Sequence, residues 1–112
     1  MNKQIVKNAP TYKVEIFIGG DYGQALDACE EFCTIVGLCV TVEKTCYVFR
    51  GGRENGIRVG LINYARFPKD EIRLWQTAEE LANHLKVRLS QGSFTIQDHE
   101  DSFFISTRDE DQ

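Results

Sequence analysis

Hydrophobic and polar residues recur along this chain with two different periods, which predict a mixture of strands and helices. Between Tyr12 and Ile18 every second residue is apolar, as in a strand with one buried face. This strand is expected to end at Gly19-Gly20. From Ala25 to Val36 apolar residues recur at helical spacing, with Asp21 placed as an N-cap and Gly37 as a C-terminal glycine.

The middle of the chain predicts a hairpin. Leu38 to Val42 and Cys46 to Phe49 are expected to be extended, separated by a bulge or tight turn at Glu43-Lys44. Arg50 to Gly56 is predicted to be a turn segment, because Asn55-Gly56 suits positive φ angles. Ile57 to Ile62 then returns as the partner strand.

The second half predicts one helix and two short strands. Asn63 to Trp75 has no clear period and contains a proline, so we expect an irregular connection. The capping box Thr77-x-x-Glu80 is predicted to begin a helix that ends before Gly92 as its C′ glycine. Two short strands around Phe94 and Phe103 are expected to flank an acidic turn.

The predicted order is therefore β-α-β-β-α-β-β in a single domain spanning residues 1–112. A strand, helix and strand can form a right-handed crossover with a slot left for a later strand. We therefore predict an α+β fold, a two-layer α/β plait of ferredoxin-like type, with a mostly antiparallel sheet and both helices on one face. Residues 1–10 are expected to form a flexible arm and residues 108–112 a frayed acidic tail.

Alternation places Phe17, Tyr47 and Phe49 on the sheet face away from the helices, which is an aromatic composition for a solvated face. Either the arm or a helix covers these rings, or they form an interface between subunits. The second interpretation predicts a homo-oligomer.

Charge narrows the classes of partner. The formal net charge is -4, but residues 1–97 carry 12 basic and 11 acidic side chains, and residues 98–112 carry one basic and six acidic ones. A nearly neutral body argues against a protein that grips long nucleic acid with a broad basic face. No secretory signal or membrane-spanning run is visible, so we expect a cytoplasmic protein.

The four cysteines lie within 18 residues at C-x3-C-x5-C-x6-C spacing, without a CxxC knuckle. We expect Cys29, Cys33, Cys39 and Cys46 to be buried as small hydrophobic residues. A zinc site is the less favoured alternative, since neither histidine is near the cluster in sequence. Disulfides are not expected in a reducing compartment.

No familiar catalytic pattern appears in the sequence. HExxH, GxSxG, Walker A and EF-hand motifs are missing, and His84 and His99 lie outside glycine-rich turns. A phosphate could closely approach the turn at Gly19-Gly20, but Asp21 would repel it. The favoured interpretation is therefore that Asp21 caps the helix that follows. The sequence thus predicts no enzyme, no catalytic residue, no metal and no cofactor.

The segment from Arg50 to Phe67 has the strongest ligand-binding character. Arginines supply bidentate contacts to phosphate, aromatic rings supply stacking surfaces, and asparagine reads a base or ribose edge. The alternative is a hairpin with solvated arginines and core aromatics. The candidate ligand-binding residues are Arg58, Asn63, Tyr64, Arg66, Phe67, Arg50 and Arg53.

The same segment carries a resemblance. The line GG-x3-G-x2-VGLINY-x-RFP, from Gly51 to Pro68, is similar to that of a family of small, mostly uncharacterised bacteriophage proteins. The likeness extends from about Tyr12 to Thr107, and Ala65 stands where the family pattern has proline.

This resemblance implies an accessory phage protein that counters host defence in the host cytoplasm. We expect it to sequester a small nucleotide-derived immune signal without catalysis, as an oligomeric sponge. The alternative is an inhibitor that binds a host or defence protein through its aromatic face or acidic tail. An enzyme that degrades such a signal ranks third. Neither a membrane nor a long nucleic acid is expected as a partner.

Overall fold

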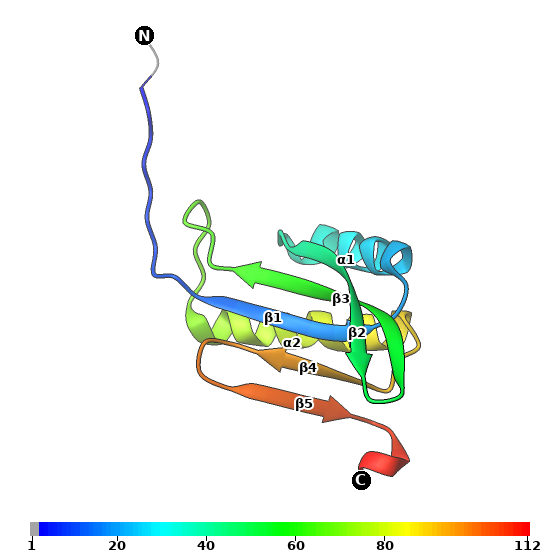
Figure 1. Ribbon diagram of the computed structural model, residues 1–112. Coiled ribbons are helices and arrows are strands. Elements are labelled where there is room, and N and C mark those ends of the chain that lie inside the picture. Colours follow the sequence, from blue (N-terminus) through cyan, green and yellow to red (C-terminus); the bar gives the residue numbers. More distant parts are fainter. Residues whose placement is uncertain (1–2) are drawn as a thin grey trace.

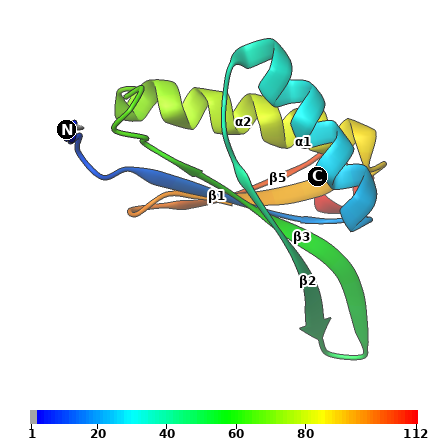
Figure 2. The same cartoon turned by 90° about the horizontal axis from the view of Figure 1, so that it is seen from above.

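The computed structural model describes residues 3–112, in which a five-stranded antiparallel sheet carries two helices on one face (Figures 1 and 2). The predicted α+β class and the order β-α-β-β-α-β-β are confirmed. The elements are β1 (Lys13–Gly19), α1 (Tyr22–Val36), β2 (Thr41–Phe49), β3 (Gly52–Ile62), α2 (Glu71–Arg88), β4 (Ser93–Gln97), β5 (Ser102–Ser106) and a 3-10 turn, η1 (Asp109–Asp111).

The strand order across the sheet is β2-β3-β1-β4-β5. β1 and β2 are both antiparallel to β3, which lies between them, so the β1-α1-β2 crossover leaves the predicted slot for β3. β4 pairs with the other edge of β1, and β5 extends the sheet by one edge strand.

The hydrophobic core lies between the sheet and the helices. Alternate residues of β1, β3 and β4 enter it, as the period-two pattern predicts. α1 contributes only small buried side chains, which lets the helix lie close to the sheet, whereas α2 supplies leucines. The largest fully buried side chains are Ile16, Ile57, Val59, Leu61, Leu74, Leu81, Leu85 and Ile96.

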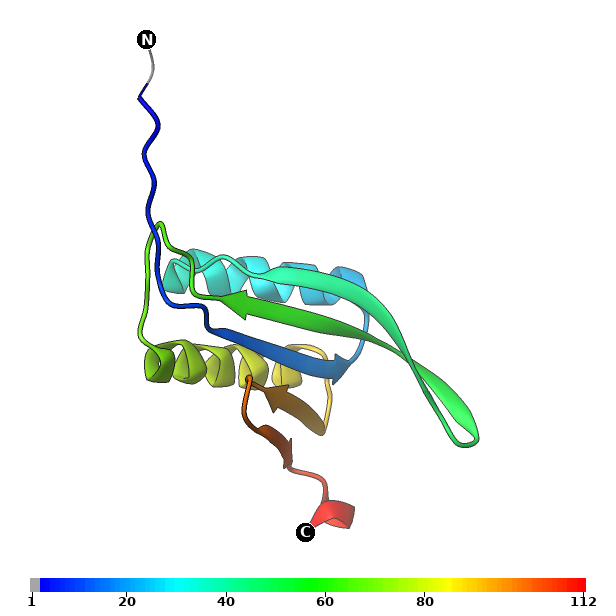
Figure 3. The ribbon, with the colours of Figure 1, turned by 60° about the vertical axis from the view of Figure 1, so that its left-hand side comes forward.

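The β2–β3 hairpin is longer and tighter than the sequence predicts. β2 runs without interruption through Glu43-Lys44, and only Arg50-Gly51 form the turn, with Gly51 at φ +87°. The predicted turn at Asn55-Gly56 is wrong, because both residues pair within β3. Figures 2 and 3 show the twisted hairpin projecting beyond the rest of the sheet.

α2 begins six residues earlier than its predicted capping box. Asp70 is the N-cap, and its carboxylate accepts a hydrogen bond of 2.7 Å from the Arg73 amide. Thr77 is buried inside the helix, where its hydroxyl donates to the Arg73 carbonyl at 2.9 Å. The helix ends at Arg88, and Ser90, at φ 54°, takes the left-handed position expected near Gly92.

The chain ends differ in structure. Residues 3–10 form an extended segment on the outside of the fold, and the expectation of a flexible arm also covers residues 1–2, which lie outside the described part (Figure 1). At the other end, Asp111 hydrogen-bonds the Ser106 hydroxyl and pairs with Arg108. None of the helices within residues 3–112 combines the length and apolar character that crossing a membrane requires.

Candidate functional site

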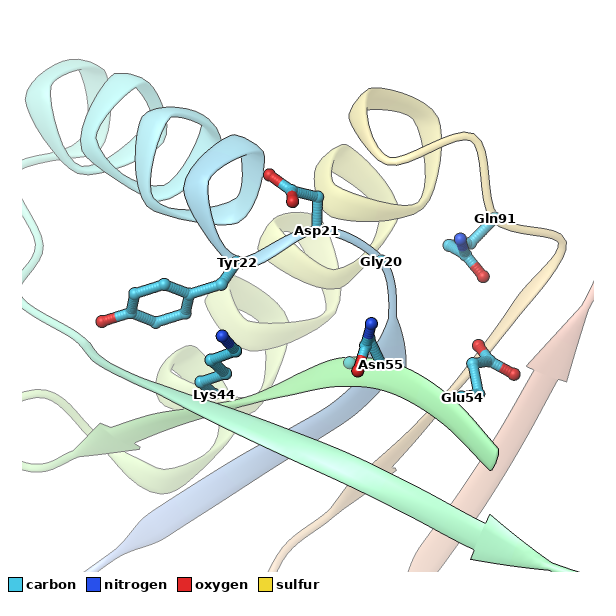
Figure 4. Close-up of a pocket in the computed structure, with 8 residues that line it drawn as sticks. Gly20, Asp21, Tyr22, Lys44, Glu54, Asn55 and Gln91 are labelled. Carbon is cyan, nitrogen blue, oxygen red and sulfur yellow. The ribbon is translucent and has the colours of Figure 1, made fainter. Parts of the chain in front are cut away.

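Two hollows meet at the end of β1. The larger, which we call the notch, has a volume of about 610 Å³ and lies between the start of α1 and the β2–β3 hairpin (Figure 4). The smaller, which we call the aromatic hollow, has a volume of about 270 Å³ and is lined by Phe17, Tyr47 and Phe104. Glu54 and Gln91 line both hollows, so the two adjoin and are taken together as the candidate site.

Unequal strand lengths create this site. β1 ends at Gly19, whose partner on β3 is Gly56, while β3 continues to Gly52. Glu54 therefore has no β1 residue beside it. The Gly20 amide donates to the Asn55 carbonyl at 3.0 Å, which holds the chain against β3 as it turns into α1.

Two oxygen acceptors converge above Gly19. A methyl group on Gly19 would overlap Glu54 Oε1 and come within 3.0 Å of Gln91 Oε1. Gln91 Nε2 donates to the Leu89 carbonyl at 3.2 Å, so the amide nitrogen is held within the chain. A carboxylate and an amide carbonyl at one point form an electron-rich spot suited to a cation.

Tyr47 supplies the largest wall of the aromatic hollow. Its ring lies over Gly56, where a methyl group would overlap Tyr47 Cε2, and its hydroxyl donates to the Ile57 carbonyl at 2.6 Å. Burial raises the pKa of the Tyr47 hydroxyl, so this group stays neutral at physiological pH. The aromatic rings therefore stand beside the oxygen pair without adding charge.

The notch has a mixed charge. Lys44 of β2 is its single cationic side chain, and Asp21 and Glu54 are its two carboxylates (Figure 4). Asp21 Oδ2 accepts the capping hydrogen bond from the Gln24 amide at 2.9 Å. Among residues 3–112, no carboxylate lies within ion-pair distance of Lys44.

The arginines predicted as ligand-binding residues lie elsewhere. Arg58 is on the open sheet face between Glu15 and Glu43, with nitrogen–oxygen distances of 3.4 and 3.0 Å. Arg50 and Arg53 lie near the tip of the hairpin. The eleven residues of β3 separate that tip from the loop after Ile62 by about 30 Å.

The loop after β3 gathers the remaining predicted residues. Asn63 is a structural clamp: its amide donates to the Pro10 carbonyl, and its oxygen accepts from the Lys69 amide, both at 2.8 Å. The rings of Tyr64 and Phe67 lie 5.6 Å apart, and Arg66 is exposed between them in sequence. The structure thus brings these four together and keeps them away from Arg50 and Arg53.

The predicted burial of all four cysteines is wrong. Only Cys29 is buried, and its burial raises the pKa of the thiol to about 12. Cys33 is half-buried, and Cys39 and Cys46 are exposed. Across residues 3–112, no three His, Cys, Asp or Glu side chains gather in a way that could hold a metal ion.

The sequence matches no protein-family model and no curated protein. The fold, however, is similar to two solved structures. A phage SAM lyase in complex with S-methyl-5′-thioadenosine aligns with a TM-score of 0.66 and 14% identity, over 95% of this chain and 97% of that chain. A phage SAM lyase in the apo state aligns with a TM-score of 0.62 and 16% identity, over 87% and 90% of the two chains.

This likeness corrects the prediction that the protein is not an enzyme. That prediction rested on the lack of a familiar catalytic motif, whereas both similar structures are named lyases. Alternation along the strands singles out two residues of the candidate site, Phe17 and Tyr47, but its polar residues are missed. The sequence predicts a turn at Glu54 and a bulge or tight turn at Lys44, and Gln91 has no predicted role.

Proposed function

We propose that this protein binds S-adenosylmethionine at the candidate site and cleaves it to S-methyl-5′-thioadenosine. The observation that carries the proposal is the convergence of Glu54 Oε1 and Gln91 Oε1 above Gly19, beside the rings of Phe17, Tyr47 and Phe104. The shared fold of the two lyase structures supports it.

A sulfonium ion is a permanent cation that offers no N–H or O–H donor. Proteins recognise such groups with carboxylates, carbonyl oxygens and the faces of aromatic rings. The candidate site offers all three kinds of partner, in Glu54, Gln91 and Tyr47. The flat adenine ring is suited to stacking against Phe17 or Phe104 on the same face.

The proposed reaction breaks the bond between the sulfonium and its aminocarboxypropyl carbon. The electron pair of that bond stays on sulfur, which becomes the neutral thioether of S-methyl-5′-thioadenosine. As that bond breaks, an oxygen of the substrate's own carboxylate bonds to the aminocarboxypropyl carbon and closes a five-membered lactone, so neither water nor a second substrate enters. The positive charge on sulfur disappears along this path.

This loss of charge defines the role of Glu54. A carboxylate facing the sulfonium stabilises the charged substrate more than the less charged transition state, so it contributes to binding rather than to the chemical step. In an infected cell, such an activity would remove the methyl donor, consistent with the counter-defence role that the phage resemblance implies.

The test is to incubate purified protein with S-adenosylmethionine and follow S-methyl-5′-thioadenosine by liquid chromatography and mass spectrometry. Wild-type protein is expected to form it, and Glu54→Gln to raise KM for S-adenosylmethionine with a smaller change in kcat. Glu79→Gln, an exposed carboxylate change on α2, is the matched control and is expected to behave as wild type. Wild-type protein that forms no S-methyl-5′-thioadenosine from S-adenosylmethionine would overturn the proposal.

A further inference from the structure

Recognition of the adenosyl group and the sulfonium leaves two charged side chains of the notch, Lys44 and Asp21, without a role. When the sulfonium lies at Glu54 and the adenosyl group lies in the aromatic hollow, the third substituent of S-adenosylmethionine carries an ammonium and a carboxylate. We propose that the notch binds this amino-acid end and that Lys44 is the specificity-determining residue that recognises its carboxylate. The inference rests on the proposed function of the same site.

Continuity of the two hollows supports this assignment. Glu54 and Gln91 are shared. Lys44 of the notch pairs with the buried Ile57 and so lies on the helix side of the sheet, whereas Phe17 of the aromatic hollow alternates with buried residues and lies on the other side. A ligand centred on the shared oxygens can therefore extend one substituent in each direction. The volume of the notch, about 610 Å³, accommodates a flexible polar chain together with water.

The side chains of the notch match a zwitterion. Lys44 of β2 pairs directly with Ile57 of β3, which is fully buried. The backbone of Lys44 is therefore held on a rigid part of the sheet. Asp21 stands at the first turn of α1, across the notch from Lys44 (Figure 4). Lys44 suits a carboxylate and Asp21 suits an ammonium, at two separate points of one hollow.

The net charge of the notch side chains makes a simple anion such as phosphate a poorer ligand than a zwitterion. The notch offers one cationic and two anionic side chains, and Asp21 and Glu54 would both repel a multiply charged anion. S-Adenosylmethionine carries two positive charges and one negative charge. Its charge pattern is thus the opposite of that presented by Lys44, Asp21 and Glu54.

Two adenosyl thioethers test the inference without turnover. S-Adenosylhomocysteine keeps the amino-acid end, whereas S-methyl-5′-thioadenosine lacks it, and both are uncharged at sulfur. Calorimetric titration of wild type, Lys44→Gln and the control Lys13→Gln compares their affinities. Lys13 is an exposed strand lysine on the opposite face, so its change removes the same charge away from the notch.

Lys44→Gln is expected to weaken S-adenosylhomocysteine binding by about two- to five-fold, the range of one exposed ion pair. The affinity for S-methyl-5′-thioadenosine should not change, and Lys13→Gln should bind both as wild type. The difference at Lys44 should shrink in high salt, because solvent-exposed ion pairs are screened. Asp21→Asn retains a side-chain oxygen for the helix cap, and it should also weaken binding of S-adenosylhomocysteine.

The outcomes separate this inference from the proposed function. If wild type forms S-methyl-5′-thioadenosine from S-adenosylmethionine but Lys44→Gln binds S-adenosylhomocysteine as wild type does, the notch assignment is wrong and the proposed function stands. Equal weakening of both ligands by Lys44→Gln also overturns the assignment, since it indicates a general loss of the site. If wild type neither binds these ligands nor consumes S-adenosylmethionine, the proposed function itself fails.

Discussion

Gly19 and Gly56 are direct partners across the β1–β3 ladder, and each leaves its side-chain space to a residue of the candidate site. Glu54 occupies the space above Gly19, and the Tyr47 ring occupies the space above Gly56. Neither glycine has a left-handed φ, so close approach is what requires glycine at these two positions. Glycine within a strand costs about 0.5–1 kcal/mol relative to alanine, which makes the pair informative.

Gly19→Ala should displace the Glu54 carboxylate and raise KM for S-adenosylmethionine while the protein remains folded. The added methyl group would overlap a side-chain oxygen, which can move, rather than backbone. Shortening the acid in Gly19→Ala/Glu54→Asp should restore part of the loss, as judged by KM and by thermal melting.

Gly60→Ala is the matched control for that experiment. Gly60 is on β3, on the same face of the sheet as Gly19 but away from Glu54, near the end of β3 that leads to Ile62. A methyl group on Gly60 would meet the Thr41 hydroxyl at 2.6 Å. This variant should keep wild-type KM. Equal effects of Gly19→Ala and Gly60→Ala on KM would show that the glycine at position 19 has no special link to Glu54.

Two locations for the ligand can be told apart by substitution. In the sequence-based hypothesis the ligand binds at Tyr64 and Arg66, whereas in the structure-based proposal it binds at Glu54. Tyr64→Ala and Arg66→Ala should leave the stabilisation of the protein by S-methyl-5′-thioadenosine unchanged, because a ligand stabilises only through the residues it contacts. Thermal melting with and without the ligand measures this. Loss of the shift in Arg66→Ala would return the site to the loop after β3.

The four thiols should differ in reactivity. Burial raises the pKa of Cys29 to about 12 from its usual 9.0, so at pH 8 this thiol stays protonated as well as inaccessible. Iodoacetamide labelling of the native protein, followed by peptide mass spectrometry, should modify Cys39 and Cys46 first and Cys29 only after unfolding. Early labelling of Cys29 would contradict its place in the core.

The fold was predictable from the sequence because its two periods are strong. The buried alternation in β1 and the apolar stripe of α1 report one-sided burial directly. The start of α2 was not, since Leu74 already lies on the buried helical face but Pro68 and the later capping box suggested an irregular loop. The capping box at Thr77 is a plausible local signal, and it masked nearly two earlier turns of the same helix.

The candidate site depends on distances that no local pattern records. Glu54 and Gln91 are far apart in sequence and meet only because β1 stops at Gly19 while β3 continues. The reach of β3 follows from the position of the hairpin turn, and β1 ends where Gly20 leads the chain into α1. The dipeptide Asn55-Gly56 is a common turn signal, but here the glycine serves the Tyr47 ring, so the turn was placed too early.

Acid should destabilise the turn between β4 and β5. Asp98 Oδ1 accepts hydrogen bonds from the Glu100 and Asp101 amides at 2.7 and 2.8 Å, and these bonds lower the pKa of the carboxyl below its usual 3.8. The stabilisation is complete above that pH and is lost as the pH falls through the lower, folded-state value. Thermal melts between pH 6 and pH 2 should show a smaller fall for Asp98→Asn, whose amide oxygen is not titrated. An equal fall would show that other carboxyl groups dominate.

The projecting hairpin bears on the homo-oligomer predicted from the sequence. Val48 and Phe49 near its tip are 74% and 55% exposed, and Phe104 on the open sheet face is 58% exposed. Exposed apolar side chains of this size on a projecting element are typical of association surfaces.

Light scattering should therefore give a mass above the 12.8 kDa of one chain. Val48→Lys/Phe49→Lys should lower that mass, because a buried ammonium group is costly. Ile35→Lys/Val87→Lys, a matched change at exposed helical positions, should leave the mass unchanged. A mass of one chain for the wild type would contradict the oligomer, and equal effects of the two double variants would remove the hairpin as its interface.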